Sequence, residues 1–139
     1  MKVFTKNLIY FIISMTILTV IFRYTLSSML DAKLFWEVWI MATAYGLGAF
    51  FLGWYFGKKD GNDLPLYDIG FRFHFATYLI CNVIGELWLL SDFHSKYENI
   101  FTVHLTALIW GAFLAIHFIF FLISRKKAIN GIKKTEIFE

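Results

Sequence analysis

Four long apolar stretches, separated by short polar connections, make up most of this chain of 139 residues. They cover residues 8–30, 34–56, 71–90 and 100–123. Each is close to the length of about 20 residues that an α-helix needs to cross about 30 Å of hydrocarbon. A water-soluble globule is implausible, because 59% of the residues are hydrophobic whereas soluble domains average about 45–50%. The expected fold is all-α: an antiparallel four-helix transmembrane bundle within residues 1–124.

The basic residues predict how such a bundle lies in its membrane. Lys and Arg near the ends of spans gather on the cytoplasmic side. If the N-terminus is inside, most of the 13 basic residues fall on that side, and the other side holds only Arg23, Lys33 and Lys96. We therefore expect both termini in the cytoplasm and a bacterial plasma (inner) membrane as the location. The basic tail, residues 125–139, is expected to anchor the chain, and its alternative role is to bind anionic lipid or an acidic partner.

Small residues form a stripe along the second stretch. They recur at spacings of four, three and four residues, so they share one face of a helix. Such stripes let helix backbones approach closely in lipid. The predicted partner lies within the chain, and a second copy is the alternative. The close-packing residues are Ala42, Gly46, Ala49 and Gly53, together with Gly111 on the small-residue face of the fourth stretch.

Polar residues within the predicted spans are the candidates for function, because ionisable groups there are costly and usually face protein or water. Asp68, Arg72, Asn82 and Glu86 lie on one stripe of the third stretch. One interpretation is internal stabilisation, since Asp68 with Arg72 and Asn82 with Glu86 are spaced to pair. The other is a polar track for ions, protons or a small polar solute.

The short connections predict which residues lie at equal depth. Glu86 falls level with His104, and Arg23 and Glu37 come close to the same layer, which gives one polar residue from each stretch. We expect Glu86 and His104 to form the centre of a buried polar site, with Arg23 as counter-charge. Glu37 points away from the small stripe of its own helix, which weakens its membership.

A second pair, His74 and His117, also falls at equal depth. The helix faces suggest that only one of the two pairs enters the shared seam, and the small residues beside His104 favour Glu86 with His104. His74 and His117 could instead be axial ligands of a b-type haem, but no cofactor is otherwise predicted. A metal site from Glu37, Glu86 and His104 would have suitable N and O ligands without any local spacing motif.

These features favour a channel-, pore- or transport-like protein that handles protons, cations or a small polar solute, either alone or as a homo-oligomer. The alternatives are a non-catalytic accessory subunit and a haem electron-transfer protein. The chain has no phosphate-binding glycine loop, no HExxH motif and no evident nucleophile–base pair, so an enzyme is not expected. Its basic tail is too short to suggest nucleic-acid binding.

Overall fold

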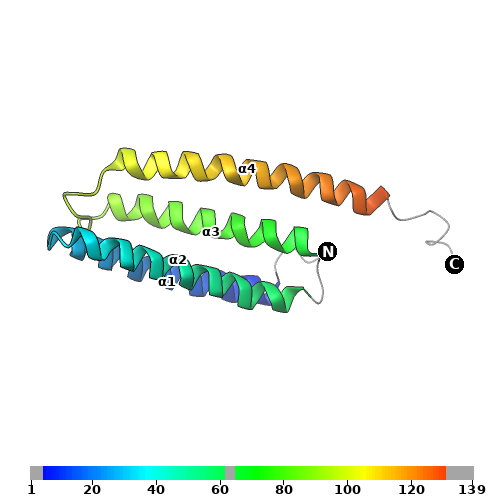
Figure 1. Cartoon of the computed structure of the whole chain (residues 1–139), viewed down its shortest axis with the longest axis horizontal. Coiled ribbons are helices and arrows are strands. Elements are labelled where there is room, and N and C mark those ends of the chain that lie inside the picture. The colour runs from blue at the N-terminus through cyan, green and yellow to red at the C-terminus, as the bar shows by residue number, and fades with distance from the viewer. Residues whose placement is uncertain (1–4, 62–64, 131–139) are drawn as a thin grey trace.

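The computed structural model describes residues 5–61 and 65–130, and they form four helices. Consecutive helices run in opposite directions along one long axis (Figure 1). The prediction of an all-α, four-helix chain is confirmed, although α2 and α4 continue past their expected ends at residues 56 and 123. The helices are α1 (Lys6–Asp31), α2 (Phe35–Asp60), α3 (Leu66–Leu89) and α4 (Ile100–Asn130).

Local sequence explains several of these ends. Thr5 caps α1 by accepting a hydrogen bond from the backbone N–H of Leu8 at 3.0 Å. Lys33, in the turn between α1 and α2, has φ of 59°, a left-handed conformation that allows a tight reversal. Lys58 and Lys59 lie in the last turn of α2, where positive charge favours the carbonyl end of a helix.

Three of the described helices are long and apolar enough to cross a membrane: α1, α2 and residues Ile100–Ala128 of α4. α3 is not among them, although its 24 residues would suffice in length. Polar side chains such as Asp68, Arg72 and Glu86 interrupt its apolar sequence. α3 is therefore the helix whose polar side chains most need partners on neighbouring helices.

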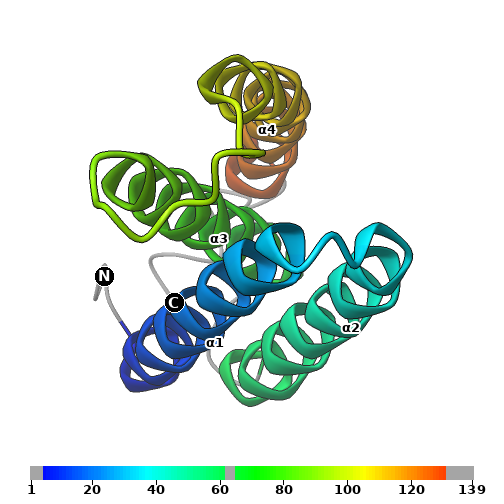
Figure 2. The same cartoon turned by 90° about the vertical axis from the view of Figure 1, so that its left-hand side faces the viewer.

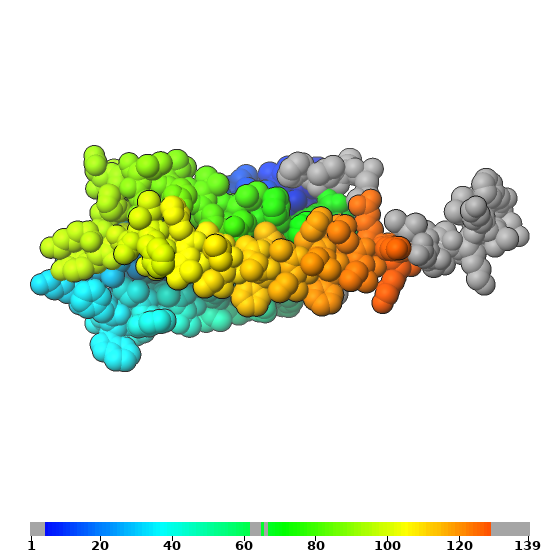
Figure 3. All heavy atoms as spheres, turned by 90° about the horizontal axis from the view of Figure 1, so that it is seen from above, coloured from blue at the N-terminus to red at the C-terminus, as the bar shows by residue number. Residues whose placement is uncertain are grey.

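The four helices do not form a symmetrical bundle. Seen along the long axis, α3 lies between α4 on one side and the α1–α2 pair on the other (Figure 2). α3 packs against each of the other three helices, whereas α4 packs only against α3 among the described helices. α4 thus runs along the outside of the molecule with much of its surface exposed (Figure 3).

The two ends of the molecule differ in their connections. We call the end with the turn at residues 32–34 and the loop at residues 90–99 the loop end. The opposite end, where α1 and α3 begin and α2 and α4 finish, is the tail end (Figure 1).

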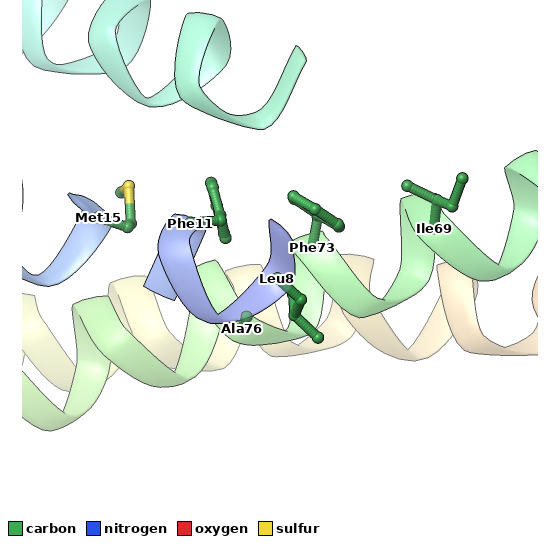
Figure 4. Close-up of a cluster of buried hydrophobic side chains, with 6 residues drawn as sticks. All are labelled: Leu8, Phe11, Met15, Ile69, Phe73 and Ala76. Atoms are coloured by element: carbon green, nitrogen blue, oxygen red, sulfur yellow. The ribbon is translucent and has the colours of Figure 1, made fainter. Parts of the chain in front are cut away.

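The hydrophobic core is small and lies near the tail end. Its fully buried centre is Phe11 and Met15 of α1, packed against Phe73 of α3 (Figure 4). The rings of Phe11 and Phe73 are 4.7 Å apart. Buried Asp60, at the end of α2, closes this region by accepting hydrogen bonds from the side chains of Thr5 and Asn7. The core therefore joins α1, α2 and α3 and does not include α4.

The small-residue stripe of α2 is only partly packed within the chain. A Cβ placed on Gly46 or Gly53 would meet no described atom within 4 Å. The close approach expected at these two glycines is therefore not made by the described residues, and Ala49 is the member that packs against the core. The close approach of α2 to α1 occurs instead at Gly48, where a Cβ would lie 3.3 Å from Leu18.

Two glycines of α2 give a matched test of this packing. Gly48→Leu must push Leu18 and α1 away, and we expect it to lower the free energy of unfolding by about 1–3 kcal/mol. Gly46→Leu extends into open space and should leave the stability of the monomer nearly unchanged. Denaturant titration of both variants in detergent measures the difference, and equal stability losses would contradict the assigned helix faces.

Candidate functional site

Arg23 lies in a buried cluster at the loop end. Its guanidinium pairs with Glu98, which stands in the loop before α4, and their side chains are 11% and 5% exposed. Ser27 also donates a hydrogen bond to the Glu98 carboxylate and accepts one from the indole N–H of Trp88 at 2.8 Å. The backbone N–H of Ser95 donates to the same carboxylate at 3.1 Å. Glu98 thus ties the loop to α1 and neutralises the arginine.

Directly beneath this cluster is a cavity of about 260 Å³ to which all four helices contribute. Arg23 belongs to both the cluster and the cavity wall. The Nε atom of Arg23 is buried and has no hydrogen-bond partner among the described residues. The polar lining comprises Thr19 and Arg23 of α1, Tyr45 of α2, Cys81 and Asn82 of α3, and Thr102, Thr106 and Trp110 of α4.

A directed chain of hydrogen bonds forms one wall of the cavity. The Thr19 hydroxyl donates to the carbonyl of Met15 at 2.7 Å, which uses its single hydrogen. The Tyr45 hydroxyl, 3.0 Å from Thr19, must therefore be the donor in that contact. The Cys81 thiol, 3.0 Å from the Tyr45 oxygen, is then the next donor. This chain links α1, α2 and α3 and orients all three polar groups.

The polar stripe predicted on α3 is divided between different partners. Asp68 and Arg72 form a two-contact ion pair, with N–O distances of 2.9 and 2.7 Å. Asn82 does not pair with Glu86, as the spacing suggested, but donates to the carbonyl of Tyr78 at 2.7 Å. Asp68 and Arg72 line a groove towards the tail end, whereas Asn82 lines the cavity. No described cavity contains all three residues.

The structure brings Glu86 and His104 together, with His104 Nε2 2.8 Å from Glu86 Oε1. Their side chains are nevertheless 43% and 56% exposed, so the described chain does not bury the pair. Arg23 does not serve as their counter-charge, because it pairs with Glu98. Glu37 is exposed in the first turn of α2 and makes no described ion pair with either residue. Of the four residues of the predicted layer, only Glu86 and His104 pair with each other, while Arg23 pairs with Glu98 from outside the layer and Glu37 joins neither pair.

His74 and His117 also meet, so both equal-depth pairs lie along the α3–α4 seam. Their Nδ1 atoms are 3.0 Å apart, and the Trp110 indole N–H donates to His74 Nε2 at 2.7 Å. With both rings neutral, His74 must carry its proton on Nδ1 and donate to His117. Both pairs make contact, but the seam buries His74 and His117 more than it buries Glu86 and His104. The prediction that Glu86 and His104 would be the buried pair was therefore wrong.

In this structure both ring nitrogens of His74 are engaged in protein contacts, Nδ1 with His117 and Nε2 with Trp110. These contacts hold α4 against α3. Axial haem ligation by the two histidines stays a prediction.

Close packing at the seam depends on Gly111. The Tyr78 hydroxyl lies 3.1 Å from the position of a Cβ on Gly111 and donates to the carbonyl of Ala107 at 3.3 Å. The small-residue face predicted on α4 therefore packs against the side chain of Tyr78 and not against the backbone of a neighbouring helix.

Sequence reasoning missed several residues of the site. Glu98 was not considered because it lies in a connection, outside every apolar stretch. Three other missed residues belong to types that are common in apolar helices, namely Tyr45, Cys81 and Trp110. They become candidates only because the structure places them around the same cavity. A signal was present for Glu98, since Arg23 within a span requires a carboxylate at its own depth.

The two ion pairs at the loop end provide a test of these assignments. Glu98→Ala leaves Arg23 without its buried partner, and we expect it to reduce the free energy of unfolding by about 3–5 kcal/mol. Glu86→Ala removes a pair that the described chain leaves exposed and should cost less than Glu98→Ala. Denaturant titration in detergent compares the two, and a greater loss for Glu86→Ala would reverse our assignment of the buried carboxylate.

The arrangement offers hydrogen-bond chemistry rather than a metal centre. Among residues 5–61 and 65–130, no group of three or more His, Cys, Asp or Glu side chains is placed to hold a metal ion. Hydroxyls, an amide, a thiol and a guanidinium converge on the cavity instead. No family model, no curated protein and no solved structure matches the chain.

Proposed function

We propose that this chain is an integral membrane protein of a bacterial plasma membrane, with the tail end and both termini in the cytoplasm. Its three long apolar helices support insertion. Lys58, Lys59 and Arg125 lie near the tail end, as the positive-inside rule requires for a cytoplasmic face. α3 would cross the membrane with the others, because its polar side chains find partners on its neighbours.

We further propose that the cavity at the loop end binds a small polar solute in a channel-like or transport function. The observation that carries this proposal is the convergence of polar groups from all four helices on one space within apolar helices. Polar groups at membrane depth are costly and usually serve either a binding site or a polar pathway.

The chemistry of the lining favours a small solute that accepts hydrogen bonds. The Nε–H of Arg23, at the wall, is a donor without a described partner. Glu98 compensates the charge of Arg23, so this part of the wall selects by hydrogen bonding rather than by charge. The cavity volume is about 260 Å³, so the solute must be small.

The route towards the tail end is closed in this structure. Phe11, Met15 and Phe73 pack between the cavity and the tail end, so passage would require a rearrangement. α4 is the element best placed to move, since it packs only against α3 among the described helices. Its movement would break the contacts of Trp110 and His117 with His74 and would spare the core.

A second candidate function is that of an accessory subunit. The exposed Glu86–His104 pair lies on the lateral surface of α3 and α4, where lipid would leave a polar pair poorly solvated. A helix of another protein or of a second copy could cover this pair. In that case the hydrogen bonds and the ion pair around the cavity would hold the helices together, and no solute would pass.

The proposed topology predicts the location of the two ends. A reporter that is active only in the cytoplasm should function when fused to either terminus and fail when inserted after Phe93, in the loop before α4. Activity at the loop site, or termini on opposite sides, would contradict the proposal.

Solute passage gives the functional test. Proteoliposomes containing the chain should be more permeable than empty liposomes to at least one probe from urea, glycerol, glycinate, chloride, potassium and protons. Thr106→Leu fills the cavity and should abolish this increase. Thr43→Leu is the matched control, because Thr43 also donates to its own helix but lies outside the described cavities. Loss in both variants, or no increase for any probe, would contradict a solute pathway.

A further inference from the structure

Another opening, distinct from the cavity near the loop end, lies nearer the tail end. It is a groove of about 490 Å³ with α3 at its base and with α1 and α4 as its walls. α1 and α4 do not pack against each other, so nothing in the described chain roofs the groove along their length. Apolar side chains line most of it, including Leu8 and Ile12 of α1, Phe75 and Leu79 of α3, and Phe121 of α4.

Charged side chains are confined to one end of this groove. Asp68 and Arg72 neutralise each other there, and Arg125 of α4 is an exposed cation beside them. Lys126 and Lys127 follow in the next positions of the helix. The groove therefore combines a long apolar body with a positively charged mouth.

The length of the groove matches one leaflet of a bilayer. Along α3 its lining runs from Asp68 to Ile80, which at about 1.5 Å per residue is roughly 18 Å. One leaflet contributes about 15 Å of hydrocarbon. In the proposed topology, the charged mouth lies at the cytoplasmic headgroups and the apolar body lies among the acyl chains of the same leaflet.

We propose that this groove is a binding site for an anionic phospholipid of the cytoplasmic leaflet. One acyl chain lies along α3 between Leu79 and Phe121, and the phosphate accepts hydrogen bonds from the Arg125 guanidinium. Arginine suits this role because its planar group makes paired, charge-assisted hydrogen bonds to phosphate. The site rests on the membrane insertion set out under the proposed function and does not depend on solute passage.

The lipid site can be tested in the full chain without measuring transport. Native mass spectrometry in mild detergent, with equal amounts of phosphatidylglycerol and phosphatidylcholine, should show phosphatidylglycerol retained at least about fivefold more often. Arg125→Ala should remove most of this preference. Lys126→Ala is the charge-matched control, because Lys126 does not line the groove, and it should retain the preference. Equal effects of the two variants would mean diffuse attraction to a basic surface and would overturn the site.

A pair of substitutions tests the apolar body of the groove. Leu79→Trp fills the space for the acyl chain and should reduce lipid retention several-fold. Val83→Trp adds the same bulk to an exposed position of α3 outside the groove and should have no effect. Undiminished retention in Leu79→Trp would overturn the proposal, as would a dimer in the parent chain that this substitution converts to monomer, since a second copy would then occupy the groove. Should Leu79→Trp fail to fold, the exposed Arg125→Ala variant still decides the outcome.

Discussion

The structure depends on the satisfaction of polar side chains on a single helix, α3. Burying a polar group without a partner costs several kcal/mol in an apolar environment, and α3 carries such groups along its whole length. Its own residues and all three neighbouring helices supply the partners. On α3 itself, Arg72 pairs with Asp68. His74 is hydrogen-bonded by Trp110 and His117 of α4. Cys81 is hydrogen-bonded to Tyr45 of α2, and Trp88 to Ser27 of α1. These contacts explain how the one described helix that is not apolar enough to count as a membrane span can occupy the centre of the molecule.

The packing divides the molecule into two parts, the three helices that share the hydrophobic core and α4, which packs on one side only. α1, α2 and α3 share the hydrophobic core and the hydrogen bonds of Thr19, Tyr45 and Asp60. α4 lies outside that core and is held to α3 by the histidine contacts, by Tyr78 at the Ala107 carbonyl, and by the exposed Glu86–His104 pair. The cavity near the loop end and the groove nearer the tail end are both partly walled by α4. A small movement of this helix would change both.

Periodicity and depth were sufficient to predict the helices and two of their contacts. The apolar stretches located all four helices, and short connections placed Glu86 level with His104 and His74 level with His117. The partner of Arg23 could not be found in this way, because the path of the loop that carries Glu98 follows no helical period. Burial was also misjudged, since α4 packs on one side only and leaves Glu86 and His104 exposed. Small residues such as Gly46 indicate where close packing is possible, but they do not indicate whether a neighbour is present.

The central claim is that the four helices line a water-accessible cavity near the loop end. Accessibility of single cysteines to a membrane-impermeant methanethiosulfonate reagent tests it most directly, in proteoliposomes and with Cys81 replaced by Ser. Thr106→Cys places a thiol in the cavity wall, and Leu108→Cys places one on the exposed outer surface of the same helix, where we expect lipid. The account predicts rapid modification at position 106 and protection at position 108. Protection at both positions, or faster modification at position 108, would contradict it.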